Sequence, residues 1–261
     1  MTDWLYRHPT AFPSKKLHRL GLACNYGIDE SGVRLAMERG VNVFLWTMKN
    51  KPFRAPLGEA LHSRREQVAV IGYSTIGWFG WGVRQGAENL LKELKVDYLD
   101  VYLLGWLGIT SAWTAATEKE LVHLRESGKV RAIGCSIHNR ERAGQLAASS
   151  PLDLLMIRYN AAHPGAERDI FPHVKDKKPS ILAYTATRWG KLLKRPRGWD
   201  GPVMSAGDCY RFQLSSPHVD LALTGPASRA ELEQNLDALE KGPLTPEEEK
   251  WIREFGKKVH G

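Results

Sequence analysis

Residues 99–106, LDVYLLGW, form an apolar and β-branched run that stops at a glycine and a tryptophan. An uninterrupted apolar run of this length is typical of a parallel strand that is buried on both faces. In a barrel of parallel strands the chemistry is done at the carboxyl ends, and Gly105 is expected to stand at such an end. The run therefore predicts a buried barrel strand, and it raises the question of why its functional end carries no side chain.

The alternation of strand and helix extends from this run in both directions. Strand-like runs are expected within residues 17–24, 41–47, 68–73, 99–104, 130–136, 152–160, 180–185 and 219–225. Each is followed by a helical pattern, within residues 29–40, 56–66, 84–96, 118–128, 139–149, 165–174, 205–216 and 228–240. Eight such units with short connections predict an α/β fold, a (β/α)8 TIM barrel in one domain spanning residues 1–261. Residues 245–259 are left over as an extra C-terminal helix, capped by Thr245 and Glu248.

Composition narrows the class of protein. Of the 261 residues, 43% are hydrophobic and 25% are charged, which is ordinary for a soluble globular protein. No apolar stretch approaches the ~20 residues of a membrane span, and the N-terminus lacks the pattern of a secretory signal. We therefore expect a cytoplasmic protein with no membrane partner. Cys24, Cys135 and Cys209 lack metal-site or redox-pair spacing, so buried thiols and no metal site are expected.

The positive charge points to a small ligand. The net charge is +8, and part of it lies in one loop, at Arg188, Lys191, Lys194, Arg195 and Arg197. No nucleic-acid-binding motif accompanies this loop, so a nucleic-acid partner is not expected. A phosphate-bearing small molecule explains a single basic loop more simply.

Five phrases of the sequence resemble the aldo-keto reductase superfamily, and the resemblance covers nearly the whole chain. They are LGLACNYG (20–27), GVNVF (40–44), GKVRAIGCSIHN (128–139), ILAYTATRWGKLL (181–193) and TGPASRAELEQN (224–235). The resemblance implies a (β/α)8 barrel that reduces carbonyls with NAD(P)H. In that family an aspartate, a tyrosine, a lysine and a histidine at the ends of early strands handle the proton.

This sequence departs from the family at each of those four positions. Leu45 stands where the aspartate is expected, and Lys49 or Asn50 stands at the tyrosine position. Tyr73 replaces the lysine, and Gly105 replaces the histidine. A positioned general acid contributes roughly 10²–10⁴-fold in rate, so we expect ordinary carbonyl reduction to be lost.

The cofactor apparatus that the resemblance implies is partly present. Matching residues predict binding of NADP(H) by Ser136 and Tyr184 at the nicotinamide, by the loop of Arg188, Gly190 and Leu192 at the pyrophosphate, and by Ser228, Arg229 and Asn235 at the adenosine phosphate. Ile137, Met156 and Gln234 replace polar residues of the family pattern. We therefore expect the phosphate end to be held better than the nicotinamide amide.

Aromatic and polar residues near the strand ends predict a pocket for a small molecule, anionic or aromatic in character. The catalytic candidates are Tyr73, with Lys49 nearby to lower its pKa, and His138. The candidates for substrate binding are Asn25, Trp46, Trp106, Arg158 and His163. For each of them a purely structural role also stays open.

Three functions remain open at this point. The first is an atypical NADP(H)-dependent reductase acting on an imine or an activated alkene. The second is a repurposed barrel enzyme with non-redox chemistry. The third is a catalytically silent protein that binds NADP(H) or another phosphate ligand, since a fold alone does not determine a function.

Overall fold

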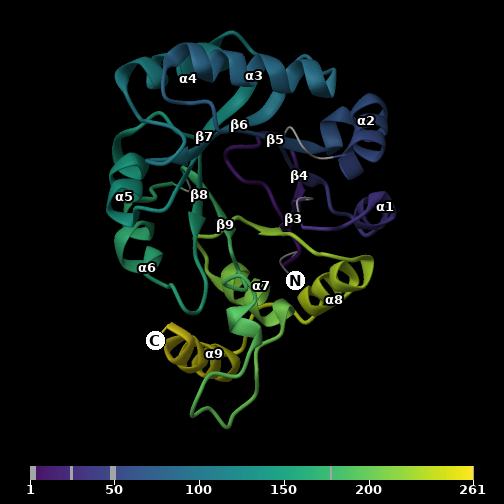
Figure 1. Cartoon of the computed structure of the whole chain (residues 1–261), viewed down its shortest axis with the longest axis vertical. Helices are drawn as coiled ribbons and strands as arrows, with labels where there is room; N and C mark the ends of the chain where they lie inside the picture. The colour runs from purple at the N-terminus through teal and green to yellow at the C-terminus, as the bar shows by residue number, and fades with distance from the viewer. Residues whose placement is uncertain (1–3, 24–25, 48–50, 177, 261) are drawn as a thin grey trace.

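The computed structural model describes residues 4–23, 26–47, 51–176 and 178–260. Its centre is a closed barrel of eight parallel strands in the order β10-β3-β4-β5-β6-β7-β8-β9 (Figure 1). The strands are β3 (Leu20–Ala23), β4 (Val43–Trp46), β5 (Ala69–Ser74), β6 (Leu99–Leu107), β7 (Val130–Ile137), β8 (Leu154–Arg158), β9 (Ser180–Tyr184) and β10 (Leu221–Thr224). The predicted (β/α)8 fold is confirmed.

Helices surround the barrel and follow the strands in turn (Figure 1). They are α1 (Glu30–Glu38), α2 (Arg54–Ser63), α3 (Gly80–Leu94), α4 (Ala115–Glu126), α5 (Arg140–Ser149), α6 (Ala166–Asp169), α7 (Ala206–Ser215) and α8 (Arg229–Leu239), with the extra helix α9 (Pro246–His260) at the C-terminus. Short 3₁₀ turns occur at η1 (Lys51–Phe53), η2 (Arg65–Gln67), η3 (Phe171–His173) and η4 (Lys191–Leu193).

The helix ends follow their capping residues. Asp29 accepts a hydrogen bond from the Gly32 N–H at the start of α1, as its position predicts. The backbone N–H of Glu248 donates to the Thr245 hydroxyl at the start of α9. One helix is shorter than expected, because α6 ends at Asp169 and the chain continues through a 3₁₀ turn that contains Pro172.

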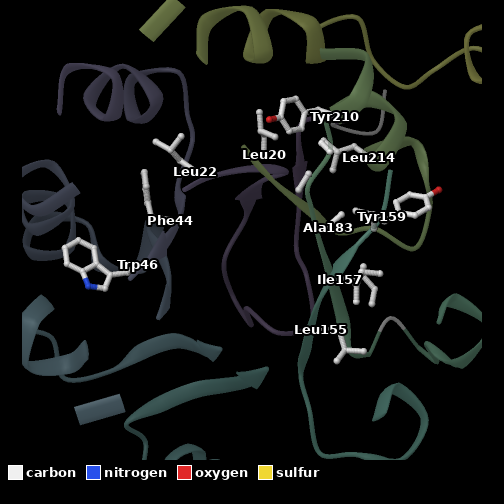
Figure 2. Packing of buried hydrophobic residues seen from close by; sticks show 14 of the residues in the cluster. Leu20, Leu22, Phe44, Trp46, Leu155, Ile157, Tyr159, Ala183, Tyr210 and Leu214 are labelled. Atoms are coloured by element: carbon white, nitrogen blue, oxygen red, sulfur yellow. The ribbon is translucent and has the colours of Figure 1, made fainter. Parts of the chain in front are cut away.

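Side chains of the barrel strands alternate between two hydrophobic clusters. Val43 and Leu45 lie in the barrel interior, whereas Phe44 and Trp46 belong to the outer cluster beneath the helices (Figure 2). Trp46 is 1% exposed, and its ring lies 6.4 Å from that of Phe53. This position does not fit the substrate-binding role predicted for Trp46, since neighbouring residues of a strand point to opposite faces.

The N-terminal segment closes the amino-terminal end of the barrel. Strands β1 (Tyr6–Arg7) and β2 (Leu17–His18) pair antiparallel outside the barrel sheet. Ala11, Phe12 and Leu17 are buried within the interior cluster. These residues form the floor of the barrel, so ligand access is from the carboxyl ends.

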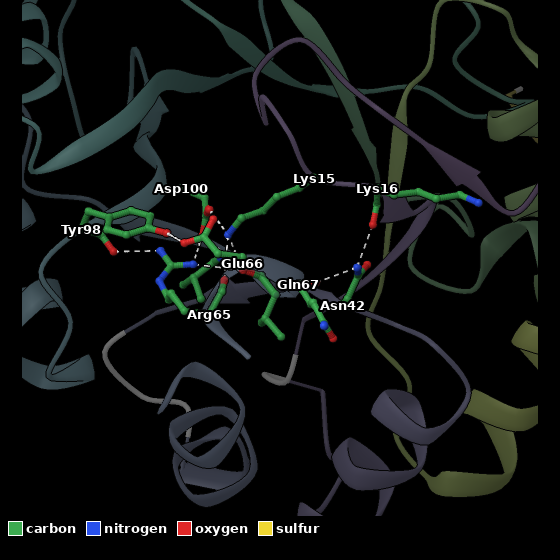
Figure 3. A network of polar contacts seen from close by, with 10 residues as sticks. Lys15, Lys16, Asn42, Arg65, Glu66, Gln67, Tyr98 and Asp100 are labelled. Carbon is green, nitrogen blue, oxygen red and sulfur yellow. Dashed lines mark hydrogen bonds and ion pairs between the residues drawn. The ribbon is translucent and has the colours of Figure 1, made fainter. Parts of the chain in front are cut away.

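A buried ionic network stabilises this floor (Figure 3). Asp100 at the start of β6 lies 2.5 Å from the Lys15 ammonium and 2.9 Å from the Arg65 guanidinium. The same carboxylate accepts a hydrogen bond from the Val70 N–H of β5. Because each charge has partners, burial of the group is compensated.

The pattern recurs around the floor, at the start of every second barrel strand. There a carboxylate or amide oxygen accepts a backbone N–H from the preceding segment, in the pairs Asn42–His18, Asp100–Val70, Asp153–Ile133 and Asp220–Ile181. The three aspartates also form ion pairs with Lys15, Arg65, Arg125, Lys178 and Arg7. These bonds fix the relative height of neighbouring strands.

Candidate active site at the barrel mouth

The alternation along the strands brings the predicted rim residues together. Leu45 belongs to the interior cluster, and Tyr73 and Tyr184 pack against it. Ser136 follows Ala132 of that cluster at even spacing along β7 and is buried. Residues two apart on a strand share a face. The carboxyl ends of β4, β5, β7 and β9 therefore present these side chains around one mouth.

Gly105 completes this rim through the ring of Tyr73. A Cβ atom built on Gly105 would lie 2.4 Å from Cζ and 2.6 Å from Cε2 of Tyr73. Real Cβ atoms do not approach a ring so closely, so the phenol fills the space that a side chain at 105 would need. This explains why position 105, two residues before the end of β6, carries no side chain.

The surroundings of Tyr73 correct one expectation. Burial raises the pKa of Tyr73, and the nearby Tyr26 acts in the same direction. The predicted lowering of this pKa is therefore not found. Lys49, the residue expected to cause it, lies outside the described residues, as does Asn25.

A pocket of about 220 Å³ opens between these strand ends and the loop after β9. It is lined by Ala23, Tyr26, Leu45, Met156, Tyr184, Thr185, Ala186, Thr187, Trp189, Gly190, Tyr210, Leu223, Thr224 and Gly225. Its wall, so far as the described residues form it, contains no carboxylate and no amine. It is an apolar and aromatic cavity with hydroxyl groups at its edge.

Tyr184 lines this pocket and hydrogen-bonds a polar residue beside it. Its hydroxyl hydrogen-bonds Nε2 of His138 and the Ser136 hydroxyl. Burial, followed by the charge of Arg158, lowers the pKa of His138, and burial raises that of Tyr184. At neutral pH the phenol therefore keeps its proton and the imidazole is neutral, and the tautomer of His138 sets which of the two groups donates. The ring of Trp106 lies 4.7 Å from that of His138.

Arg158 and His163 are not among the residues that line the pocket. Arg158 pairs in register with Tyr184 across β8 and β9. Nδ1 of His163 lies 3.1 Å from Oδ1 of Asn160, and its ring lies 5.1 Å from that of His260. Burial, with the charge of Arg158 next, lowers the pKa of His163 to about 4. His163 is thus neutral at pH 7.

The predicted pyrophosphate loop divides into residues at the pocket and residues turned away from it. Gly190 lines the pocket with a φ of 77°, in the left-handed region that favours glycine. The Arg188 guanidinium donates to the Val259 carbonyl near the end of α9. The Leu192 side chain is fully buried in the outer core, so only its backbone is available to a ligand there.

The predicted adenosine-phosphate residues are engaged with their own neighbours. Ser228 caps α8 by accepting from the Glu231 N–H, and Arg229 lies 3.4 Å from Glu233. Asn235 is 5% exposed and donates to the Thr224 hydroxyl. Asn235 is thus engaged with Thr224 at the edge of the pocket, and its role at the adenine stays a prediction.

Sequence reasoning missed part of the pocket wall. Tyr210 comes from α7, and it was not predicted because a buried helical tyrosine reads as ordinary core. The ring of Tyr26 lies on Gly225, where an added Cβ would come within 2.2 Å of it. This second ring-on-glycine contact parallels that of Tyr73 and Gly105.

The exposed aromatic loop before α3 was also missed. Ile76, Trp78, Phe79 and Trp81 are between 42% and 69% exposed, and the rings of Phe79 and Trp81 stack 6.3 Å apart. The signal was present as the phrase TIGWFGWG at residues 75–82.

The described residues contain no group of three or more His, Cys, Asp or Glu side chains arranged to hold a metal ion. None of their helices combines the length and the apolar character needed to cross a membrane.

Part of the chain is similar in sequence to known aldo-keto reductases. Residues 81–206 match the family described as Aldo/keto reductase family. An aldo-keto reductase of Bacillus subtilis is 30% identical over 149 residues, which are 52% of this chain and 44% of that protein. An NADH-specific methylglyoxal reductase of Escherichia coli is 25% identical over 112 residues, 42% of this chain and 34% of that protein. The chain thus matches less than half the length of these relatives.

Solved structures share the barrel. The holo form of an aldo-keto reductase from Bacillus halodurans has a TM-score of 0.77 at 20% identity, covering 96% of this chain and 95% of that chain. An aldo/keto reductase from Klebsiella pneumoniae in complex with NADP and acetate has a TM-score of 0.73 at 21% identity, covering 93% and 92%. The family match shows that residues 81–206 are similar to aldo/keto reductases, and the solved structures show that the barrel fold is shared.

Proposed function

We propose that this chain is an atypical NADP(H)-dependent oxidoreductase whose rim has lost the residues of ordinary carbonyl reduction. The observation that carries the proposal is the contact between Tyr73 and Gly105, where a Cβ would come within 2.4 Å of the ring. These are the two positions at which the family's lysine and histidine are expected. Because the Tyr73 ring fits over Gly105, the contact supports a coordinated replacement of the two residues.

The pocket beside Tyr184 suits the nicotinamide end of NADP(H). The half-buried Tyr184 ring offers a flat face, and Leu45, Met156 and Leu223 supply apolar walls. A volume of about 220 Å³ accommodates one ring system and not a whole dinucleotide. The rest of the cofactor would extend over the loop of residues 185–190. The barrels from Klebsiella pneumoniae that resemble this one contain NADP or NADPH.

The adenosine-phosphate end of the cofactor would meet protein groups that are already hydrogen-bonded to one another. Ser228 and Arg229 lie at the amino end of α8, where an anion is favoured by the helix dipole. The Ala227 N–H at this end already donates to the Glu231 carboxylate, and Asn235 already donates to Thr224. Each contact that a ligand must replace costs about 1 kcal/mol. We therefore expect NADPH to bind more weakly than a fully open site would allow.

The side chains at the rim define which substrates suit this site. Bound NADPH supplies a hydride. Tyr184, held by His138 and Ser136, presents its ring as a platform. Burial raises the pKa of Tyr73, so this phenol is a weaker acid than a free tyrosine. A protonated imine takes a hydride at carbon and becomes a neutral amine without a further proton, so it is a suitable substrate, and an activated alkene is the next choice.

A second candidate function is non-redox acid–base chemistry. The specific observation in its favour is the hydrogen bond between the Tyr184 hydroxyl and His138 Nε2. A neutral imidazole and a protonated phenol in contact can serve as base and acid in a proton transfer or a dehydration.

Titration of NADPH fluorescence with the purified protein tests cofactor binding. We expect saturable enhancement in the wild type and a weaker response in Tyr184→Leu, which removes the ring. Arg64→Met is the matched control, because Arg64 is exposed and lies at the end of α2, before the amino end of β5. No fluorescence change at millimolar cofactor would remove NADP(H) from the proposal.

A panel of carbonyls, imines and enones tests the reaction. We expect NADPH oxidation with an imine or an enone and none above background with a simple carbonyl. Binding of NADPH without hydride transfer to any of the three classes would instead favour a catalytically silent cofactor-binding protein. Substrate conversion without NADPH would favour the non-redox enzyme.

A further inference from the structure

We propose that Arg158 binds a carboxylate group of the substrate beside the Tyr184 platform. The side chains of Leu154 and Met156 point into the barrel, and Leu155 and Ile157 point outward. Alternation places Arg158 on the inward side, one step beyond Met156 toward the mouth. This assignment gives the substrate of the proposed function a chemical class and rests on that function for the reaction.

Arg158 is an unpaired cation in a half-buried position. Among the described residues it has no ion pair or hydrogen bond within bonding distance. The fully buried arginines are satisfied, because Arg19 donates to the Leu214 and Val219 carbonyls and Arg211 pairs with Glu248. The guanidinium of Arg158 therefore retains its capacity to bind an anion.

The neighbours of Arg158 add no negative charge. Its positive charge lowers the pKa of His138 and of His163. Arg140 lies 2.9 Å from Asp169, a carboxylate that Arg168 also contacts. The Arg188 guanidinium donates to the neutral Val259 carbonyl. Since no carboxylate of the described residues forms an ion pair with Arg158, an anion placed here is attracted without such a competitor.

The surrounding rings indicate the rest of the ligand. Arg158 pairs in register with Tyr184, whose ring lies 5.6 Å from that of His138, and Trp106 follows at 4.7 Å from His138. Flat apolar surfaces favour a flat, unsaturated body. One unpaired arginine, whose charge lowers the pKa values of the nearby His138 and His163, matches a single negative charge. We therefore infer an unsaturated or aromatic carboxylate and not a phosphate dianion.

Calorimetric titration with benzoate, the neutral isostere benzamide and inorganic phosphate tests this assignment. We expect the wild type to prefer benzoate over benzamide by roughly 10- to 100-fold, the range for one charge-assisted hydrogen-bonded contact. Arg158→Met is expected to abolish this preference, and Arg158→Lys to retain part of it. Arg64→Met, which removes an exposed arginine elsewhere, should leave it unchanged. Thermal unfolding of each variant confirms that the barrel is intact.

Equal affinity for benzoate and benzamide in the wild type, or a preference that survives Arg158→Met, would overturn the assignment. Phosphate binding as tightly as benzoate would overturn the choice of a carboxylate. The same titrations are repeated with NADPH present. Loss of NADPH binding with retained benzoate selectivity would contradict the proposed reductase and leave Arg158 as an anion site. NADPH binding without benzoate selectivity would contradict only the role of Arg158.

Discussion

At the amino-terminal end of the barrel, Asp100 is shared by Lys15 and Arg65, whereas at the carboxyl end Arg158 has no acceptor among the described residues. The floor is a ring of paired charges that also binds the backbone of neighbouring strands. The mouth carries cations, neutral histidines and phenols around an apolar pocket. We infer that charge at the floor serves stability, while charge at the mouth is available for the proposed ligand.

The largest effect is expected at the floor, from Asp100→Ala. The substitution leaves the Val70 N–H without its acceptor, and it leaves the buried Lys15 ammonium with two carbonyls but no counter-charge from Asp100. Removing one partner of a buried pair costs about 3–5 kcal/mol. Urea denaturation measures the free energy of unfolding. Asp200→Ala, at an exposed position, is the control, and an equal loss in both variants would contradict a special role for the floor network.

At the mouth, Gly105→Ala should destabilise by about 1–3 kcal/mol, because the new Cβ collides with the Tyr73 ring. In the Tyr73→Ala background the same change should cost much less, since the ring is gone. A double-mutant cycle on the free energy of unfolding gives the coupling. Strictly additive effects would show that the two residues are not in contact.

His163→Gln is expected to change how the stability of the protein depends on pH. The pKa of His163 is about 4 in the folded protein and about 6.5 when unfolded. The folded state thus binds the proton less tightly than the unfolded state does. The contribution of His163 to the free energy of unfolding is therefore fully present above pH 6.5 and is lost as the pH drops toward 4. Removing the group should flatten this decline by about 1 kcal/mol, after allowance for solvent screening.

Comparison of the slopes of stability against pH tests this expectation, because other groups titrate in both proteins. The charges of Arg158, Arg188 and Arg140, and the neighbouring His260, are the causes besides burial. Parallel slopes in wild type and variant would mean that His163 is freely solvated.

The smallest effect is expected from Tyr184→Phe. The variant keeps the ring and loses the hydrogen bonds to His138 and Ser136. The affinity for NADPH should therefore fall by less than about 1 kcal/mol, less than in Tyr184→Leu, where the ring contact is also lost. Fluorescence titration of the two variants side by side measures both values. An equal loss in both would assign the effect to the hydroxyl.

The barrel was predictable because apolar strand runs and helical patterns alternate along the chain. The position of Trp46 was predictable too, because Leu45 faces inward and the next residue of a strand must face outward. The floor pattern stood in the sequence as Asn42, Asp100, Asp153 and Asp220, each between two apolar residues. To predict that these residues accept hydrogen bonds at the starts of strands, one has to expect polar and charged side chains to stabilise the amino-terminal end of the barrel.

Other features depend on contacts that a linear pattern does not contain. The fit of Tyr73 over Gly105 depends on the stagger of two adjacent strands, so the sequence showed an absent side chain and not its replacement. The burial of Asn235 against Thr224 depends on how α8 packs on β10. The unpaired state of Arg158 depends on which acceptors lie around it, and many loops contribute to that surrounding.

The most direct test of the proposed reductase is single-turnover oxidation of bound NADPH, followed by absorbance after mixing with a reactive dicarbonyl or with a preformed imine. We predict that NADPH is bound, that the dicarbonyl oxidises it no faster than in the absence of protein, and that the imine oxidises it measurably faster. Rapid oxidation by the dicarbonyl that is abolished in Tyr73→Phe would contradict this prediction, because the barrel mouth would then still supply an ordinary proton donor.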